Sequence, residues 1–80
     1  MKLNEIYYKV ELKIDYPTQV HVQKDMFNEL ASAEQRFQEQ FAITETGFLS
    51  SRFTRYTIAL AEVHPEEKRQ IIIKYRQAPI

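Results

Sequence analysis

The most regular pattern in this chain is a strict alternation of apolar and polar residues between Ile6 and Tyr16. The apolar positions on one side of this alternation are Tyr8, Val10, Leu12, Ile14 and Tyr16. Mostly charged residues separate them. Because successive side chains of a strand point to opposite faces of its sheet, the pattern predicts a strand with one buried face and one solvated face.

Pro17 ends this alternation and predicts a turn, because proline has no backbone N–H to donate to a sheet ladder. The residues from Gln19 to Gln23 alternate again, with Val20 and Val22 on one side, and predict a short return strand. A helix that begins after Pro17 and runs to Phe41 is the alternative interpretation.

A helix is predicted from Asp25 to Phe41, because apolar residues recur there at the spacing of a helical stripe. The stripe consists of Met26, Phe27, Leu30, Ala33, Phe37 and Phe41. Asp25 is the expected N-cap, since its carboxylate can accept from the free amides of the first turn, and Asn28 would cap a later start. Gly47, the only glycine, predicts the exit turn because glycine adopts positive φ readily.

Two more strands are predicted after the helix, over Arg52 to Val63 and Arg69 to Arg76, with a polar turn at His64 to Lys68 between them. In the first of these strands, bulk places Tyr56, Ile58 and Leu60 toward the core. In the second, alternation predicts that Ile71, Ile73 and Tyr75 face the helix. The residues expected to face away are Ile72, Lys74 and Arg76.

This order of elements, ββαββ, predicts an α+β fold. The simplest arrangement is a two-layer sandwich, in which one four-stranded antiparallel sheet packs against a single helix on one face. At 80 residues, the chain is expected to form one small domain.

Composition and charge narrow the class of protein. Basic and acidic residues are equal in number, but residues 1–50 hold five basic against eight acidic ones, and residues 51–80 hold six against three. Neither an acidic mimic of DNA nor a broadly basic nucleic-acid coat fits this balance. The absence of cysteine favours a cytoplasmic protein, and we predict neither a signal peptide nor a membrane span.

Candidate catalytic chemistry is sparse. His21 and His64 stand far apart in the sequence, without the spacing of a zinc-binding pair. No serine lies in a glycine-flanked nucleophile turn, and there is no glycine-rich phosphate loop. We therefore predict a protein that is not an enzyme, with no catalytic residues, no metal and no cofactor.

The sheet face that the single helix leaves uncovered is the predicted functional surface. On the two strands predicted after the helix, this face carries a mixture of small, apolar and basic side chains. A sheet face that is fully exposed to solvent would be more polar. The residues that carry this mixture are Phe53, Arg55, Ala59, Ala61, Val63, Ile72 and Lys74. We predict that this surface contacts another protein or a second copy of the chain in a homodimer.

Nucleic-acid binding is the alternative function, because cations and aromatic rings share the same predicted face. The residues concerned are Tyr7, Lys9, Lys13, Arg55, Lys74 and Arg76. A small-molecule site built between two subunits is a third hypothesis.

In element order, the whole chain resembles the small ββαββ proteins that phages and mobile elements encode, many of them of unassigned function. The resemblance implies an inhibitor or adaptor that binds a host or defence protein.

Overall fold

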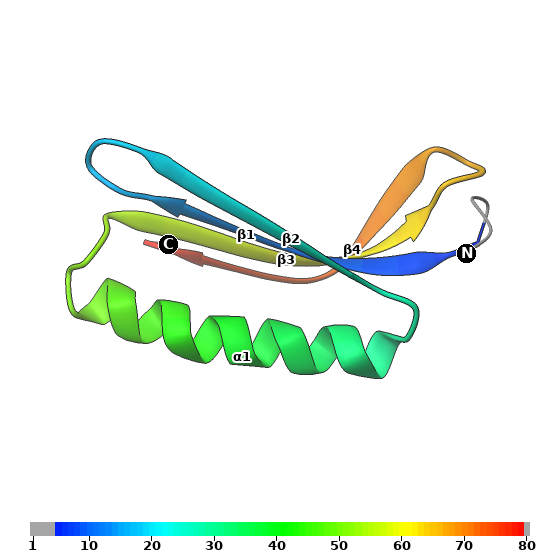
Figure 1. The fold of residues 1–80 in the computed structure, drawn as a ribbon, viewed down its shortest axis with the longest axis horizontal. Helices are drawn as coiled ribbons and strands as arrows, with labels where there is room; N and C mark the ends of the chain where they lie inside the picture. Colours follow the sequence, from blue (N-terminus) through cyan, green and yellow to red (C-terminus); the bar gives the residue numbers. More distant parts are fainter. Residues whose placement is uncertain (1–4, 80) are drawn as a thin grey trace.

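The computed structural model describes residues 5–79, in which four strands form one antiparallel sheet and a single helix lies along one face (Figure 1). The elements are β1 (Tyr7–Asp15), β2 (Val20–Phe27), α1 (Leu30–Leu49), β3 (Arg55–His64) and β4 (Arg69–Ala78). The strand order is β2-β1-β3-β4, so that β2 and β4 form the two edges. The predicted α+β fold is confirmed.

The core lies between α1 and the two central strands. Alternate residues of β1 and β3 point toward the helix, because directly paired residues in an antiparallel sheet share a face. Buried residues of the central strands are Val10, Leu12, Ile14, Tyr56, Ile58 and Leu60. Ala33 and Phe37 of α1 meet them, so the central part of the predicted helical stripe is confirmed.

The structure corrects the start of the helix. The residues from Asp25 to Phe27 belong to β2, which pairs with β1 through eight consecutive residue pairs. Cross-strand pairing therefore overrides the helical spacing of this stretch. Helix α1 begins at Leu30 after the N-cap Glu29, so the predicted start at Asp25 and the alternative start after Pro17 are both wrong.

The structure also corrects the end of the helix, which continues to Leu49 instead of stopping at Phe41. Gly47 lies inside the helix, without positive φ, and the chain leaves through Ser51, whose φ is 59°. A Cβ atom at Gly47 would lie 2.7 Å from Cε1 of Phe53. Glycine is needed here for close packing, and the predicted exit turn at this residue is wrong.

A β-bulge changes the faces of β4. The β3–β4 register shifts between Leu60 and Ala61, so that Leu60 pairs with Lys74 whereas Ala61 pairs with Ile72. Ile73 is the extra residue. Ile71 faces the helix side and Ile72 faces away, as predicted, but the faces predicted for Lys74, Tyr75 and Arg76 are wrong. Beyond the bulge, the hairpin bends away from α1 (Figure 1).

Candidate interaction surface

The sheet face turned away from α1, called the outer face below, carries large exposed apolar side chains at both margins. They come from the two edge strands, and between 46% and 61% of each is exposed. The residues are Val20, Val22 and Met26 of β2, and Ile72 and Tyr75 of β4. No helix or strand of residues 5–79 covers this face (Figure 1).

The rest of the outer face carries charged side chains and is, on balance, basic. It contains four cations and two anions, namely Lys9, Lys13, Lys24, Arg55, Glu11 and Asp15. Lys24 Nζ lies 3.4 Å from Glu11 Oε2, and Arg55 Nε lies 4.0 Å from Asp15 Oδ2. Lys9 and Lys13 have no ion-pair partner within residues 5–79. The outer face therefore has apolar margins and a centre with two unneutralised cations.

Asp15 is the one residue of this face with a buried atom that lacks a hydrogen bond among the described residues. Its Oδ1 is shielded from solvent without a partner. The side chain borders a hollow of about 340 Å³ beside the C-terminal end of β4, which Lys13 and Arg55 also line. Of these two cations, only Arg55 comes within ion-pair distance of the carboxylate.

Three of the seven predicted interface residues lie on the outer face with some exposure: Arg55, Ala59 and Ile72. Ala61 and Val63 share the face but are only 1% and 7% exposed. Their register neighbours include the longer side chains of Tyr7, Lys9 and Ile72. The predicted face of Ala61 and Val63 is confirmed, but both side chains are covered by these neighbours in the single chain.

Phe53 is not an outer-face residue. It precedes β3 and is buried in a cluster of aromatic rings, with ring centroids 5.7 Å from Tyr16, 6.4 Å from Phe48 and 6.2 Å from Tyr56. This cluster closes one end of the core. The predicted position of Phe53 on the uncovered face is wrong, because the third strand begins at Arg55 instead of Arg52.

The structure divides the predicted nucleic-acid-binding residues between two faces. Tyr7, Lys9, Lys13 and Arg55 lie on the outer face. Lys74 and Arg76 lie on the helix side, because the bulge shifts the alternation of β4.

Both displaced cations contact the helix. Lys74 Nζ lies 3.0 Å from Glu34 Oε2, and the guanidinium of Arg76 lies 5.8 Å from the centre of the Phe41 ring. These contacts join β4 to α1, although the partly exposed ion pair contributes little to stability. Lys74 is therefore not on the outer face, where it was predicted to be. The predicted basic patch that combines Lys74 and Arg76 with the other cations of that face is also wrong.

Sequence reasoning missed the β2 part of the outer face. Val20 and Val22 were expected in a strand that ended at Gln23, and Met26 was expected on the helix. The signal was weak, because Met26 shares the parity of Val20 and Val22 but the charged Lys24 interrupts the alternation between them. It competed with the helical spacing of the same residues.

A groove of about 420 Å³ lies between α1 and β2 on the helix side. Core residues form its floor, and its rim carries amide and cationic groups, among them Gln23, Gln40 and Arg52. Ile43 also lines it and is 72% exposed. The groove exists because α1 packs chiefly against β1 and β3 and leaves the β2 edge uncovered.

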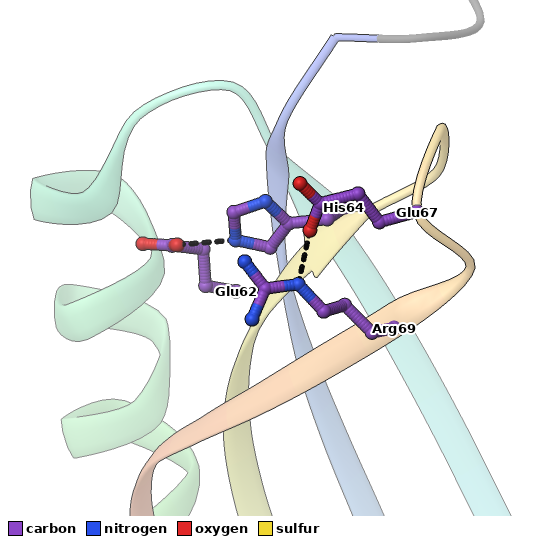
Figure 2. A network of polar contacts seen from close by, with 4 residues as sticks. All are labelled: Glu62, His64, Glu67 and Arg69. Carbon is purple, nitrogen blue, oxygen red and sulfur yellow. Dashed lines mark hydrogen bonds and ion pairs between the residues drawn. The ribbon is translucent and has the colours of Figure 1, made fainter.

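A polar cluster occupies the end of the β3–β4 hairpin, beyond the helix. Figure 2 shows His64 beside Glu62 on β3, and Arg69 beside Glu67 across the turn. The distance from His64 Nε2 to Glu62 Oε1 is 2.5 Å, and Arg69 forms an ion pair with Glu67. Each contact joins residues two positions apart, the first within β3 and the second between the turn and the start of β4.

The Tyr56 hydroxyl donates a hydrogen bond to the carboxylate of Glu45, which joins β3 to α1. Burial raises the pKa of Tyr56 to about 12, and the hydrogen bond and charge of Glu45 act in the same direction. A tyrosine that remains protonated across the neutral range is a structural donor.

Comparison with protein-family models, curated proteins and solved structures finds no match. Within residues 5–79, no three or more histidine, aspartate or glutamate side chains gather closely enough to hold a metal ion. In the same range, no helix has the length and apolar character needed to cross a membrane.

Proposed function

We propose that this protein is a non-enzymatic interaction module whose outer face binds another protein, as an inhibitor or adaptor of the kind that phages and mobile elements encode. The observation that supports the proposal is the exposed apolar margin on each edge strand, with Val22 and Ile72 half exposed on a face that no described element covers. Exposed patches of this kind mark interaction sites.

Charge defines the kind of partner that suits this surface. Lys9 and Lys13 have no acidic partner within the described residues and stand between the two apolar margins. A protein with an apolar patch and acidic side chains next to it would bury the margins and pair with both lysines. In this proposal, the protein acts in the cytoplasm.

The test is affinity capture from a nuclease-treated cell lysate with three versions of the protein. Ile72→Asp places a charge on the outer face, and Ile43→Asp places the same charge on the exposed side of α1. A protein retained by the parent and by Ile43→Asp, but lost from Ile72→Asp, supports the proposal. Circular dichroism checks that both variants are folded.

Two results would contradict the proposal that the outer face binds another protein. Equal retention by all three versions would show that the outer face is not the binding surface. Retention that disappears on nuclease treatment, or affinity for nucleic acid that falls steeply with salt, would identify a nucleic-acid binder.

A further inference from the structure

The free edge of β2 is a regular strand with its outward backbone groups unpaired within residues 5–79. Its eight residues pair with β1 without a bulge, and no other strand lies beside it. Tyr16 N–H donates to the Gln19 carbonyl, so the backbone groups of Gln19 point toward β1. Backbone groups alternate in direction along a strand, and the odd-numbered residues of β2 therefore bond to β1. The backbone groups of the even-numbered residues point outward, and these residues are Val20, Val22, Lys24 and Met26.

We propose that a second copy of this chain pairs with this edge, antiparallel, about a twofold axis that passes beside Gln23. Each copy would then extend the sheet of the other, with both helices on the same side. The proposal is independent of the proposed function, since edge pairing leaves both outer faces open.

The sequence of β2 is self-complementary in this register. Val20 would face Met26 of the second copy, His21 would face Asp25, and Val22 would face Lys24, with each pair occurring twice. The first of these pairs is apolar on the outer face, and the second joins an imidazole to a carboxylate on the helix side. The outward-pointing even-numbered residues face one another, as hydrogen-bonded pairs require.

Other registers are less favourable for reasons of charge and length. A seven-residue pairing is also available about Lys24, but it sets Lys24 directly against its own copy, and like charges in that position are destabilising. Pairing about Val22 uses only the five residues from 20 to 24. Pairing about Asp25 opposes two carboxylates.

The other sheet edge is a poor site for self-pairing. Strand β4 carries the cations Arg69, Lys74 and Arg76 and no anion, so two copies would repel each other. Its bulge at Ile73 also interrupts the ladder, which is a known way of protecting an edge from pairing. By contrast, β2 carries both signs of charge and has no bulge.

Cysteine cross-linking tests the register directly, because the chain has no cysteine of its own. In Gln23→Cys, the two thiols would face each other in a non-hydrogen-bonded pair, about 4.5 Å apart between Cα atoms, which is within disulfide range. We expect rapid disulfide dimer formation under mild oxidation.

Lys24→Cys and Ile72→Cys are the matched controls. The first thiol would lie opposite Val22 of the second copy, and the second lies on the β4 edge. Both should cross-link at least about tenfold more slowly, since their thiols lie outside bonding range of each other. Faster cross-linking by either control than by Gln23→Cys would overturn the proposed register.

A charge exchange tests the same pairing without cysteine. His21→Asp would set two carboxylates against each other and weaken self-association at least about tenfold, or 1.4 kcal/mol. Adding Asp25→His restores the imidazole–carboxylate pair, because each position faces the other, and association should recover. Sedimentation equilibrium measures the mass, and circular dichroism checks folding.

The parent chain should show reversible association between its own mass of 9.6 kDa and twice that mass. A single-chain mass at millimolar concentration would overturn the proposal. Failure of the double exchange to recover association, with the fold intact, would also overturn it. Neither result would bear on outer-face binding, which the capture experiment tests separately.

Discussion

Gly47 shows how one missing side chain positions a whole aromatic cluster. The Phe53 ring packs directly on the helix backbone at Gly47, and three other rings surround it, so that it cannot easily move aside. The space that a β-carbon would take is already filled by a ring atom. Local helix propensity, which disfavours glycine, is therefore overruled by packing.

We expect Gly47→Ala to lower the free energy of unfolding. Overpacking against Phe53 costs about 1–3 kcal/mol, whereas the gain in helix propensity is only about 1 kcal/mol. Urea denaturation measures the difference. In a Phe53→Leu background the ring is absent, and the same change should be neutral or stabilising. An equal loss in both backgrounds would contradict the packing explanation.

At the scale of elements, α1 contacts the sheet through hydrophobic packing, a hydrogen bond and an ion pair. Phe37 and Ala33 supply hydrophobic burial against the central strands. The Tyr56 hydroxyl bonds to Glu45 near one end of the helix, and Lys74 pairs with Glu34 nearer the other. The first polar contact involves a buried group, whereas the second is partly exposed and contributes little.

The raised pKa of Tyr56 predicts a loss of stability at high pH. The unfolded chain releases this proton near the ordinary value of 10.0, whereas the folded chain holds it until about pH 12. Stability from this group is therefore complete below pH 10 and declines as the pH rises to 12. The decline is on the order of 2–3 kcal/mol.

Denaturation at several pH values between 8 and 12 measures that decline. Tyr56→Phe should flatten it, because phenylalanine has no proton to release. Tyr75→Phe removes an exposed tyrosine of the outer face instead and serves as the control, which should retain the decline. If both variants gave the same pH profile, Tyr56 would not be its source.

The positions of the elements were largely predictable, whereas several of their boundaries and faces were not. The alternation of apolar and polar residues was sufficient to locate β1, because the spacing of Val10, Leu12 and Ile14 fits a strand and does not fit a helix. From residue 25 to 27, strand and helix patterns overlap, and the pairing with β1 that decides between them is not visible in one sequence. The bulge at Ile73 was equally hidden, because nothing in β4 itself marks an extra residue.

Consequently the candidate surface was predicted in part. The existence of an uncovered sheet face follows from the count of elements, and Ile72 and Arg55 were placed on it correctly. Lys74 and Arg76 were misplaced by the bulge, and Phe53 by an early strand start. The β2 margin was missed because Met26 also fits a helical stripe.

At the scale of the whole molecule, edge pairing would combine two small cores into one assembly. A single chain of this size buries a limited fraction of its surface, so association is an effective source of stability. Only the folded chain presents a β2 edge. Its stability should therefore depend on protein concentration.

We expect the melting temperature of the parent chain to rise with concentration from micromolar to millimolar. The rise should be smaller for the His21→Asp variant, because its association is weaker, and the His21→Asp, Asp25→His exchange should recover the rise of the parent chain. Differential scanning calorimetry at three concentrations is sufficient. A melting temperature that does not change with the concentration of the parent chain would contradict self-association.

The bulge at Ile73 links the length of one strand to the distribution of charge over the molecule. Lys74 and Arg76 reach the helix only because one extra residue precedes them in the ladder. Removing Ile73 while keeping the pairing on either side of it would make the ladder regular and leave every charged residue on its present face. If Ile73 instead paired in a ladder that continued unbroken from the hairpin end, Lys74 and Arg76 would face outward, so relatives with identical charged residues would differ in which surface is basic according to whether the bulge forms.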